Sequence, residues 1–154
     1  MDVAKAKLSL ADYMLTQTYP SIKEPKLLVV VLENIFSCFT NAMAGILHYE
    51  KTFKRISGFS GDFEHCLEVF NQNCVKRYSL AIEYSKIMSE LKELVSEHKK
   101  SPVEFSRKDS FVICSDNYHI KIVTFEHLKK YLAVTKKFVE DANKIVNREE
   151  DLFR

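Results

Sequence analysis

Apolar residues recur at steps of three and four along most of the chain, which is the spacing of one face of an α-helix. The clearest stripe comprises Leu80, Tyr84, Ile87, Met88, Leu91, Leu94 and Val95. The same spacing predicts further helices over Val3 to about Thr18, about Glu24 to Lys54, Phe63 to Cys74, and from Thr124 to beyond Ile145. The pattern therefore predicts about five helices.

The expected helix boundaries coincide with residues that interrupt helical backbone. Tyr19-Pro20-Ser21 is expected to end the first helix, and the Gly-Phe-Ser-Gly run at 58–61 is the clearest loop. A break or kink is expected around 76–79, and Ser101-Pro102 should end the fourth helix. Thr124 is expected to cap the amino end of the last helix.

The period of the pattern changes to two shortly before the last helix. The runs 111–114 and 120–123 alternate as strands do, and Asp116-Asn117 between them suits a tight turn. We therefore expect an all-α fold, a bundle of about five helices with one β-hairpin inserted before the last helix. It should form a single domain over residues 1–154. The expected core comprises Leu28, Val31, Leu32, Ile35, Phe36, Phe39, Phe70, Ile87, Leu91, Leu94, Leu128, Tyr131 and Phe138.

Composition narrows the classes of function. The 154 residues are 46% hydrophobic, enough for one sizeable core, and the net charge of +2 gives no overall basic field toward nucleic acid. With only three glycines, none at the required spacing, the chain can form neither a phosphate-binding loop nor a dinucleotide fingerprint. The four cysteines form no CxxC pair and the histidines no HxxxH pair, so we expect reduced thiols, no metal site and no cofactor.

The amino-terminal residues form no apolar segment of the kind that directs secretion, so a cytoplasmic location is expected. The stretch from Leu27 to Leu47 carries one charge, Glu33, and its length suits a membrane span. Polar residues interrupt it, however, and each would need a partner inside lipid. We therefore interpret the stretch as the central helix of a bundle and expect no membrane association.

A narrow polar stripe runs along this otherwise apolar helix. Its members are Glu33, Asn34, Ser37, Asn41 and His48. It admits three interpretations: a cleft with His48 and Glu33 as acid–base or ligand groups; a solvent-facing side, or a stripe whose amides form hydrogen bonds across the bundle; or a close helix contact. The third interpretation uses small residues, including Ala44 and Gly45, and would place a dimer interface here.

Polar and charged residues also cluster around the expected hairpin. The candidate binding residues are Lys99, Lys100, Arg107, Lys108, Tyr118, His119 and Lys121. With aromatic residues interleaved, a single-stranded RNA could find both phosphate partners and stacking surfaces there. Lys51, Lys54, Arg55, Lys76 and Arg77 would extend the patch if the fold brought them near. A solvated surface or a protein-binding surface would have the same composition.

The long central helix and the helices around it resemble the HEPN superfamily, whose members are small bundles that often dimerise. The run from Lys99 to Asp116 also resembles a set of uncharacterised archaeal proteins. HEPN ribonucleases carry an Arg and a His separated by four to six residues, and no His follows an Arg at that distance here. The resemblance therefore implies a bundle that acts by binding, and it transfers no catalytic residue.

We expect a non-catalytic interaction module that self-associates, with a dimer favoured and a protein or RNA as a further partner. The alternatives are an RNA-binding protein that uses the basic hairpin segment, or a divergent nuclease of the HEPN type. The sequence leaves catalysis open because triads assemble in space rather than along the chain.

Overall fold

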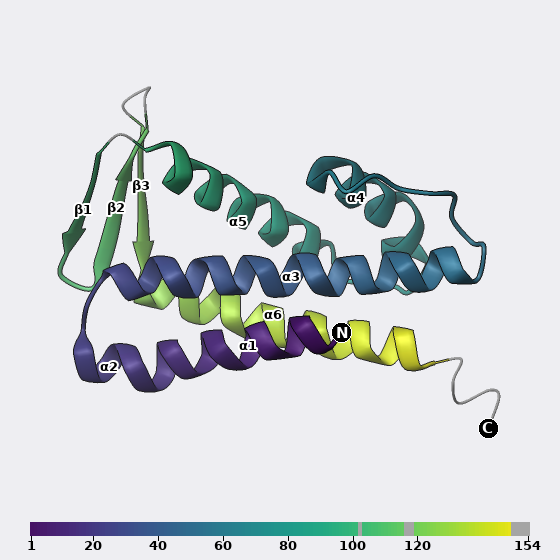
Figure 1. Ribbon diagram of the computed structural model, residues 1–154, viewed down its shortest axis with the longest axis horizontal. Coiled ribbons are helices and arrows are strands. Elements are labelled where there is room, and N and C mark those ends of the chain that lie inside the picture. The colour runs from purple at the N-terminus through teal and green to yellow at the C-terminus, as the bar shows by residue number, and fades with distance from the viewer. Residues whose placement is uncertain (102, 116–118, 149–154) are drawn as a thin grey trace.

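The longest helix, α3 (Lys26–Thr52), runs along the middle of the molecule, and the other helices pack around it (Figure 1). The computed structural model describes residues 1–101, 103–115 and 119–148. The other elements are α1 (Asp2–Tyr13), the π-helical η1 (Met14–Thr18), α2 (Tyr19–Ile22), α4 (Phe63–Phe70), the π-helical η2 (Asn71–Val75), α5 (Ile82–Lys100), β1 (Val103–Arg107), β2 (Ser110–Cys114), β3 (Ile120–Thr124) and α6 (Phe125–Asn147).

α3 is buried along much of its length because apolar residues occupy most of its sides. Leu28, Leu32 and Phe39 are fully buried, and α1, α5 and α6 pack against the helix. The prediction of one uninterrupted central helix is confirmed. In the described part of the chain, α3 alone is long and apolar enough to cross a membrane. Of its most apolar stretch of 18 residues, 56% is buried inside the molecule. Core helices of soluble proteins have the same composition, so the absence of a membrane span stays a prediction.

Aromatic rings join the helices at the centre of the core. Phe138 of α6 stacks on Phe39 of α3 with ring centroids 5.0 Å apart, and it contacts Phe70 edge-on at 5.9 Å. Tyr84 of α5 lies 5.0 Å from the same ring, so one side chain connects four helices. Three predicted core residues pack at the edge of the core and are only partly buried: Phe36, Leu94 and Tyr131. The other predicted core residues are buried.

The first helix does not end at Tyr19-Pro20-Ser21, and that prediction is wrong. The helix widens into the π-helical turn η1 and continues through Pro20 to Ile22. Pro20 lies in the first turn of α2, where a missing N–H is tolerated. The helix ends instead where Lys23 adopts the left-handed conformation, with φ of 53°.

The predicted hairpin is confirmed as β2 and β3, but a third strand was missed. β1 pairs antiparallel with β2, so the region is a three-stranded sheet in the order β1-β2-β3. The all-α description is therefore corrected to a mostly helical fold with a small sheet before the last helix. The sequence of β1 carries only two apolar residues, because an edge strand has a single neighbour and buries little. The predicted turn at Asp116-Asn117 lies outside the described residues.

Other predicted boundaries are found where expected. The break around residues 76–79 is confirmed by Ser79, whose φ of 52° ends the helical stretch before α5. Thr124 caps α6, and its hydroxyl accepts a hydrogen bond from the backbone N–H of His127 at 3.1 Å. α6 begins directly after β3, and this cap satisfies one of the backbone N–H groups that the first turn of the helix leaves unpaired.

Candidate functional site

The sheet has two faces of different character. Phe111, Ile113 and Val123 point into the core, and α3, α5 and α6 cover that side. By strand alternation and register, the opposite side carries the residues of an outer sheet face: Val103, Phe105, Val112, Ile120 and Ile122. Four of these are 42% to 62% exposed. Val112 lies on the central strand and is buried, although it does not belong to the core cluster. Its burial is explained if the neighbouring side chains of the outer sheet face cover it. The fold therefore leaves an apolar sheet face uncovered.

A cavity of about 540 Å³ continues this outer sheet face toward the end of α2. Ile122 of β3 forms one wall of the cavity. Tyr19 and Phe125 form another, and their rings stack with centroids 5.3 Å apart. The Tyr19 hydroxyl donates a hydrogen bond to Asp109 at 3.0 Å. Burial, then this hydrogen bond, raises the pKa of Tyr19 to about 12. The rim carries both signs of charge, in Lys23, Lys108, Asp109 and Glu126.

The structure divides the basic residues predicted to bind RNA. Arg107 and Lys108 lie at one end of the sheet, whereas Lys99, Lys100 and His119 lie near the other end. A five-residue strand spans roughly 13 Å, which separates the two groups. Lys121 points to the inner side, where it forms an ion pair with Glu93 at 3.0 Å. Tyr118 lies outside the described residues.

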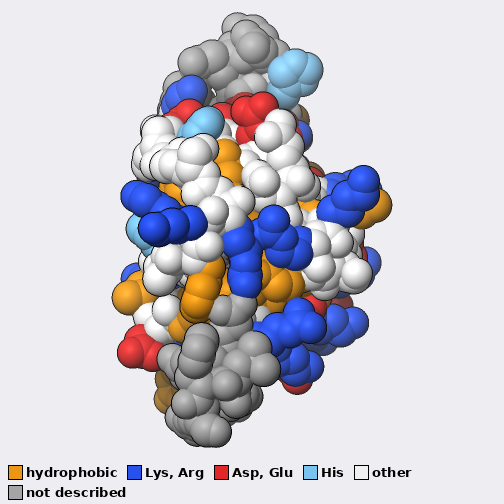
Figure 2. Space-filling view, turned by 90° about the vertical axis from the view of Figure 1, so that its right-hand side faces the viewer, with side chains coloured by type: hydrophobic (Ala, Val, Ile, Leu, Met, Phe, Trp, Pro, Cys, Tyr) orange, Lys and Arg blue, Asp and Glu red, His pale blue; other side chains and the backbone are white. Residues whose placement is uncertain are grey.

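The second group of basic residues lies far from the sheet. Lys51, Lys54, Arg55, Lys76 and Arg77 are all exposed, and they surround the carboxyl end of α3 and the turn after η2. Lys51 is about 27 Å further along α3 than Glu33, the α3 residue that lies near the sheet. Figure 2 looks onto this end of the molecule and shows Lys and Arg side chains gathered there. The fold therefore does not bring these residues to the hairpin.

A buried carboxylate lies beneath this basic end. Glu50 is fully buried and accepts hydrogen bonds from Arg77 and from the Tyr78 hydroxyl, and Arg55 lies 3.3 Å away. This cluster was not predicted from the sequence. A signal was present, because Glu50 occurs three and four residues after Leu47 and Ile46 and so continues the buried side of α3.

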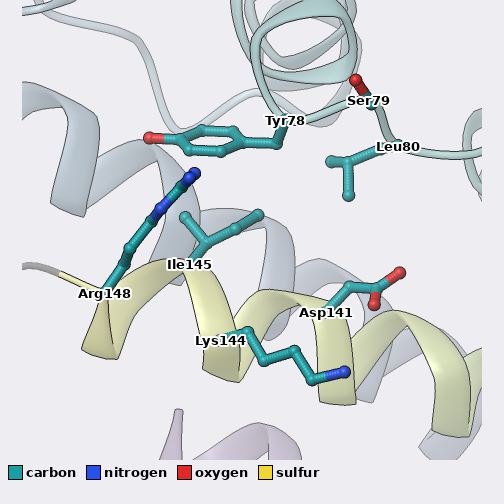
Figure 3. A pocket seen from close by; sticks show the side chains of 7 residues that line it. All are labelled: Tyr78, Ser79, Leu80, Asp141, Lys144, Ile145 and Arg148. Atoms are coloured by element: carbon teal, nitrogen blue, oxygen red, sulfur yellow. The ribbon is translucent and has the colours of Figure 1, made fainter.

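A pocket of about 340 Å³ adjoins this cluster (Figure 3). Tyr78, Ser79 and Leu80 form one wall, and Asp141, Lys144, Ile145 and Arg148 of the last helical turns form the other. Arg148 points toward Tyr78 in Figure 3. Asp141 accepts a hydrogen bond from Tyr84 at 2.7 Å, and burial raises the pKa of that phenol. The carboxylate of Asp141 therefore already connects α6 to α5 through this hydrogen bond.

The amides of the polar stripe form hydrogen bonds within their own helix. Asn34 donates to the carbonyl of Val30 at 2.8 Å, and Asn41 donates to that of Ser37 at 2.7 Å. The interpretation of hydrogen bonds across the bundle therefore does not describe these amides. A Cβ at Gly45 would lie 3.1 Å from the sulfur of Met1, so the close contact at this glycine is with the start of α1 in the same chain.

Glu33 and His48, the two titratable members of the stripe, lie in different surroundings. A carboxylate oxygen of Glu33 lies 3.3 Å from one ring nitrogen of His98, and the other ring nitrogen lies 2.8 Å from Glu104 of β1. His48 instead contacts the ring of Phe59 at 5.1 Å. Fifteen residues of helix separate Glu33 from His48 by about 22 Å, so the two cannot form one acid–base pair.

The buried thiols of Cys38 and Cys74 are unsuited to nucleophilic chemistry. All four cysteines are free, and burial raises the pKa of Cys38 to about 12 and that of Cys74 to about 11. A thiol is a weak nucleophile until it ionises. Among the residues that the structure describes, no group of three His, Cys, Asp or Glu side chains is arranged to hold a metal ion.

Comparison with known proteins gives no relative: no family model, curated protein or solved structure matches this chain.

Proposed function

We propose that this chain is a non-catalytic interaction module whose outer sheet face binds the same face of a second copy. The observation that carries the proposal is the exposure of Val103, Phe105, Ile120 and Ile122 on one face of a three-stranded sheet. Apolar side chains gathered on one exposed face are costly in water, and together with the adjoining cavity they favour a surface that binds a partner. Self-association also agrees with what a HEPN-like layout implies, and that resemblance itself stays a prediction.

The chemistry of this face favours a protein over RNA. Phe105 is its only aromatic member, and the others are β-branched aliphatic residues, which pack against apolar side chains but offer no ring on which a base can stack. The guanidinium of Arg107 lies 5.8 Å from the centroid of the Phe105 ring, so one cation already occupies a side of that ring. The division of the other cations between the two ends of the sheet also weakens the RNA alternative.

A second copy of the chain is the partner that matches both the shape of the outer sheet face and the charges on the rim of the adjoining cavity. Two sheet faces pack about 10 Å apart, and in a two-fold dimer the same face of each copy forms the interface. Three strands of five residues present roughly 200 Å², whereas a stable interface needs about 800 Å² from each partner. The adjoining cavity must therefore contribute. Its rim supplies opposite charges, such as Lys108 and Glu126, which can pair across a two-fold axis.

Sedimentation equilibrium over a range of concentrations tests this proposal. The wild type should be a dimer, and a Val103→Lys, Ile120→Lys double variant should be a monomer with an unchanged circular dichroism spectrum. Ile82→Lys is the matched control, because Ile82 is 80% exposed on α5, outside the sheet, and the control should remain a dimer. A monomeric wild type at high concentration, or a dimeric double variant, would refute the proposal.

A separate binding measurement tests the alternative that this chain recognises RNA. A fluorescent single-stranded RNA at low salt should show no binding to the wild type. Binding that an Arg107→Ala, Lys108→Ala double variant abolishes, and that falls steeply as salt rises, would replace the proposal with RNA recognition.

A further inference from the structure

A third pocket, of about 320 Å³, lies away from the sheet between α3, α4, α5 and the loop at 58–61. Its walls are mostly apolar, with the rings of Phe36, Phe59 and Phe63 and the side chain of Met43. The pocket lies beside the polar stripe of α3 and includes His48. Its size and apolar lining are those of pockets that bind small organic molecules.

A single ammonium group is the main charge in this lining. The Lys92 nitrogen lies 5.9 Å from the centroid of the Phe36 ring and 5.6 Å from that of Phe63. Among the described residues, Lys92 has no carboxylate within ion-pair distance. A second ammonium, that of Lys51, lies 6.0 Å from the centroid of Phe59. An apolar cavity is thus bordered by positive charge.

A thiol in the lining and a carboxylate beside the pocket add to this picture. The Cys66 thiol donates a hydrogen bond to the carbonyl of Ser60 at 2.9 Å. Burial, and then the charge of Asp62, raises the pKa of this thiol, so it remains protonated. Asp62 is therefore a negative charge close to the pocket, and it acts against the two ammonium groups without lining the cavity.

We propose that this pocket binds a small amphipathic anion, an organic carboxylate whose apolar body lies among Phe36, Phe59 and Phe63 and whose charged group faces Lys92. An apolar body removes the cavity surface from water, and an anion supplies the negative partner that Lys92 lacks. Neutral and cationic molecules of the same shape would gain only the first of these contributions.

Isothermal titration calorimetry with octanoate and octylammonium tests the proposal. Octanoate should bind with one site per chain, and octylammonium should bind at least about tenfold more weakly because its charge has the wrong sign. Lys92→Met keeps the apolar stem and removes the charge, so it should weaken octanoate binding by about tenfold. Asp62→Asn should strengthen binding, since it removes the opposing charge.

Two variants separate this site from a general affinity for apolar chains. Lys86→Met is the matched control, because Lys86 is exposed on α5 and does not line the pocket, and it should bind octanoate as the wild type does. The Val103→Lys, Ile120→Lys variant should also bind normally, so a failure of the dimer proposal leaves this one intact. Equal binding of the two ligands, no octanoate binding by the wild type, or full binding by Lys92→Met would overturn the proposal.

Discussion

Arg77 donates a hydrogen bond to the carboxylate of Glu50, a side chain that is fully buried, whereas 39% of the arginine side chain is exposed. The two residues are 27 positions apart and connect the end of α3 to the turn before α5. A buried carboxylate is stable only if it is paired and hydrogen-bonded. Here the partners reach it from the surface, so the charge is compensated while the guanidinium stays partly hydrated.

Replacing Glu50 by Gln should lower the free energy of unfolding by about 2–3 kcal/mol, because the guanidinium groups lose their buried counter-charge. Urea denaturation monitored by circular dichroism measures the change. Glu140→Gln is the control, since Glu140 is exposed and pairs with Lys144 at 3.7 Å, and its effect should stay within about 0.5 kcal/mol. Equal effects of the two substitutions would show that the buried position of Glu50 contributes nothing.

Phe138→Ala should destabilise the fold by about 3–5 kcal/mol, because this fully buried ring contacts aromatic residues of three other helices. Guanidinium denaturation gives the value. Phe138→Leu should lose less, since Leu fills more of the cavity than Ala does. A loss below about 1 kcal/mol for the alanine variant would contradict the central position of this ring.

Thr124→Ala should lower stability by about 1 kcal/mol through loss of the hydrogen bond to the His127 N–H. Thr124→Ser keeps an oxygen in the same place and should be close to the wild type. Thermal unfolding of the three proteins side by side tests this. The cap is unimportant if the Ala and Ser variants melt at the same temperature.

Stability should fall between about pH 10 and pH 12 in part through Tyr19. The pKa of this phenol rises from 10.0 to about 12 in the fold, since burial, and then the hydrogen bond to Asp109, disfavours the phenolate. The contribution of neutral Tyr19 is therefore fully present below pH 10 and is lost as the pH rises through 12. Urea denaturation across this range should show a smaller fall for Tyr19→Phe than for the wild type.

Tyr13→Phe provides the control for this pH dependence. Tyr13 is 63% exposed on α1, and its replacement should leave the fall in stability unchanged. Parallel curves for the wild type and Tyr19→Phe would show that Tyr19 ionises equally easily in the folded and unfolded chains.

The local features of the fold could be predicted because each is encoded within a short stretch of residues. The three- and four-residue spacing predicts α5, the apolar run at 27–47 predicts the central position of α3, and Thr124 predicts the start of α6. Pro20 misled the same reasoning, because its effect depends on whether the preceding turn is α-helical or π-helical. Residue types alone do not indicate whether the turn before Pro20 is α-helical or π-helical.

Features that need contacts between distant residues could not be predicted in this way. β1 exists because β2 pairs with it, and its own five residues carry little strand signal. The basic residues around the hairpin are close in sequence, yet the pleat and the strand length place Lys121 and Arg107 on opposite sides of the sheet. The order of apolar and polar residues along the chain thus determines which segments are helical and which apolar side chains of the helices are buried, because these follow from local periodicity. The packing of segments far apart in the chain determines which side chains share a pocket, which face of the sheet stays uncovered and which carboxylate is buried.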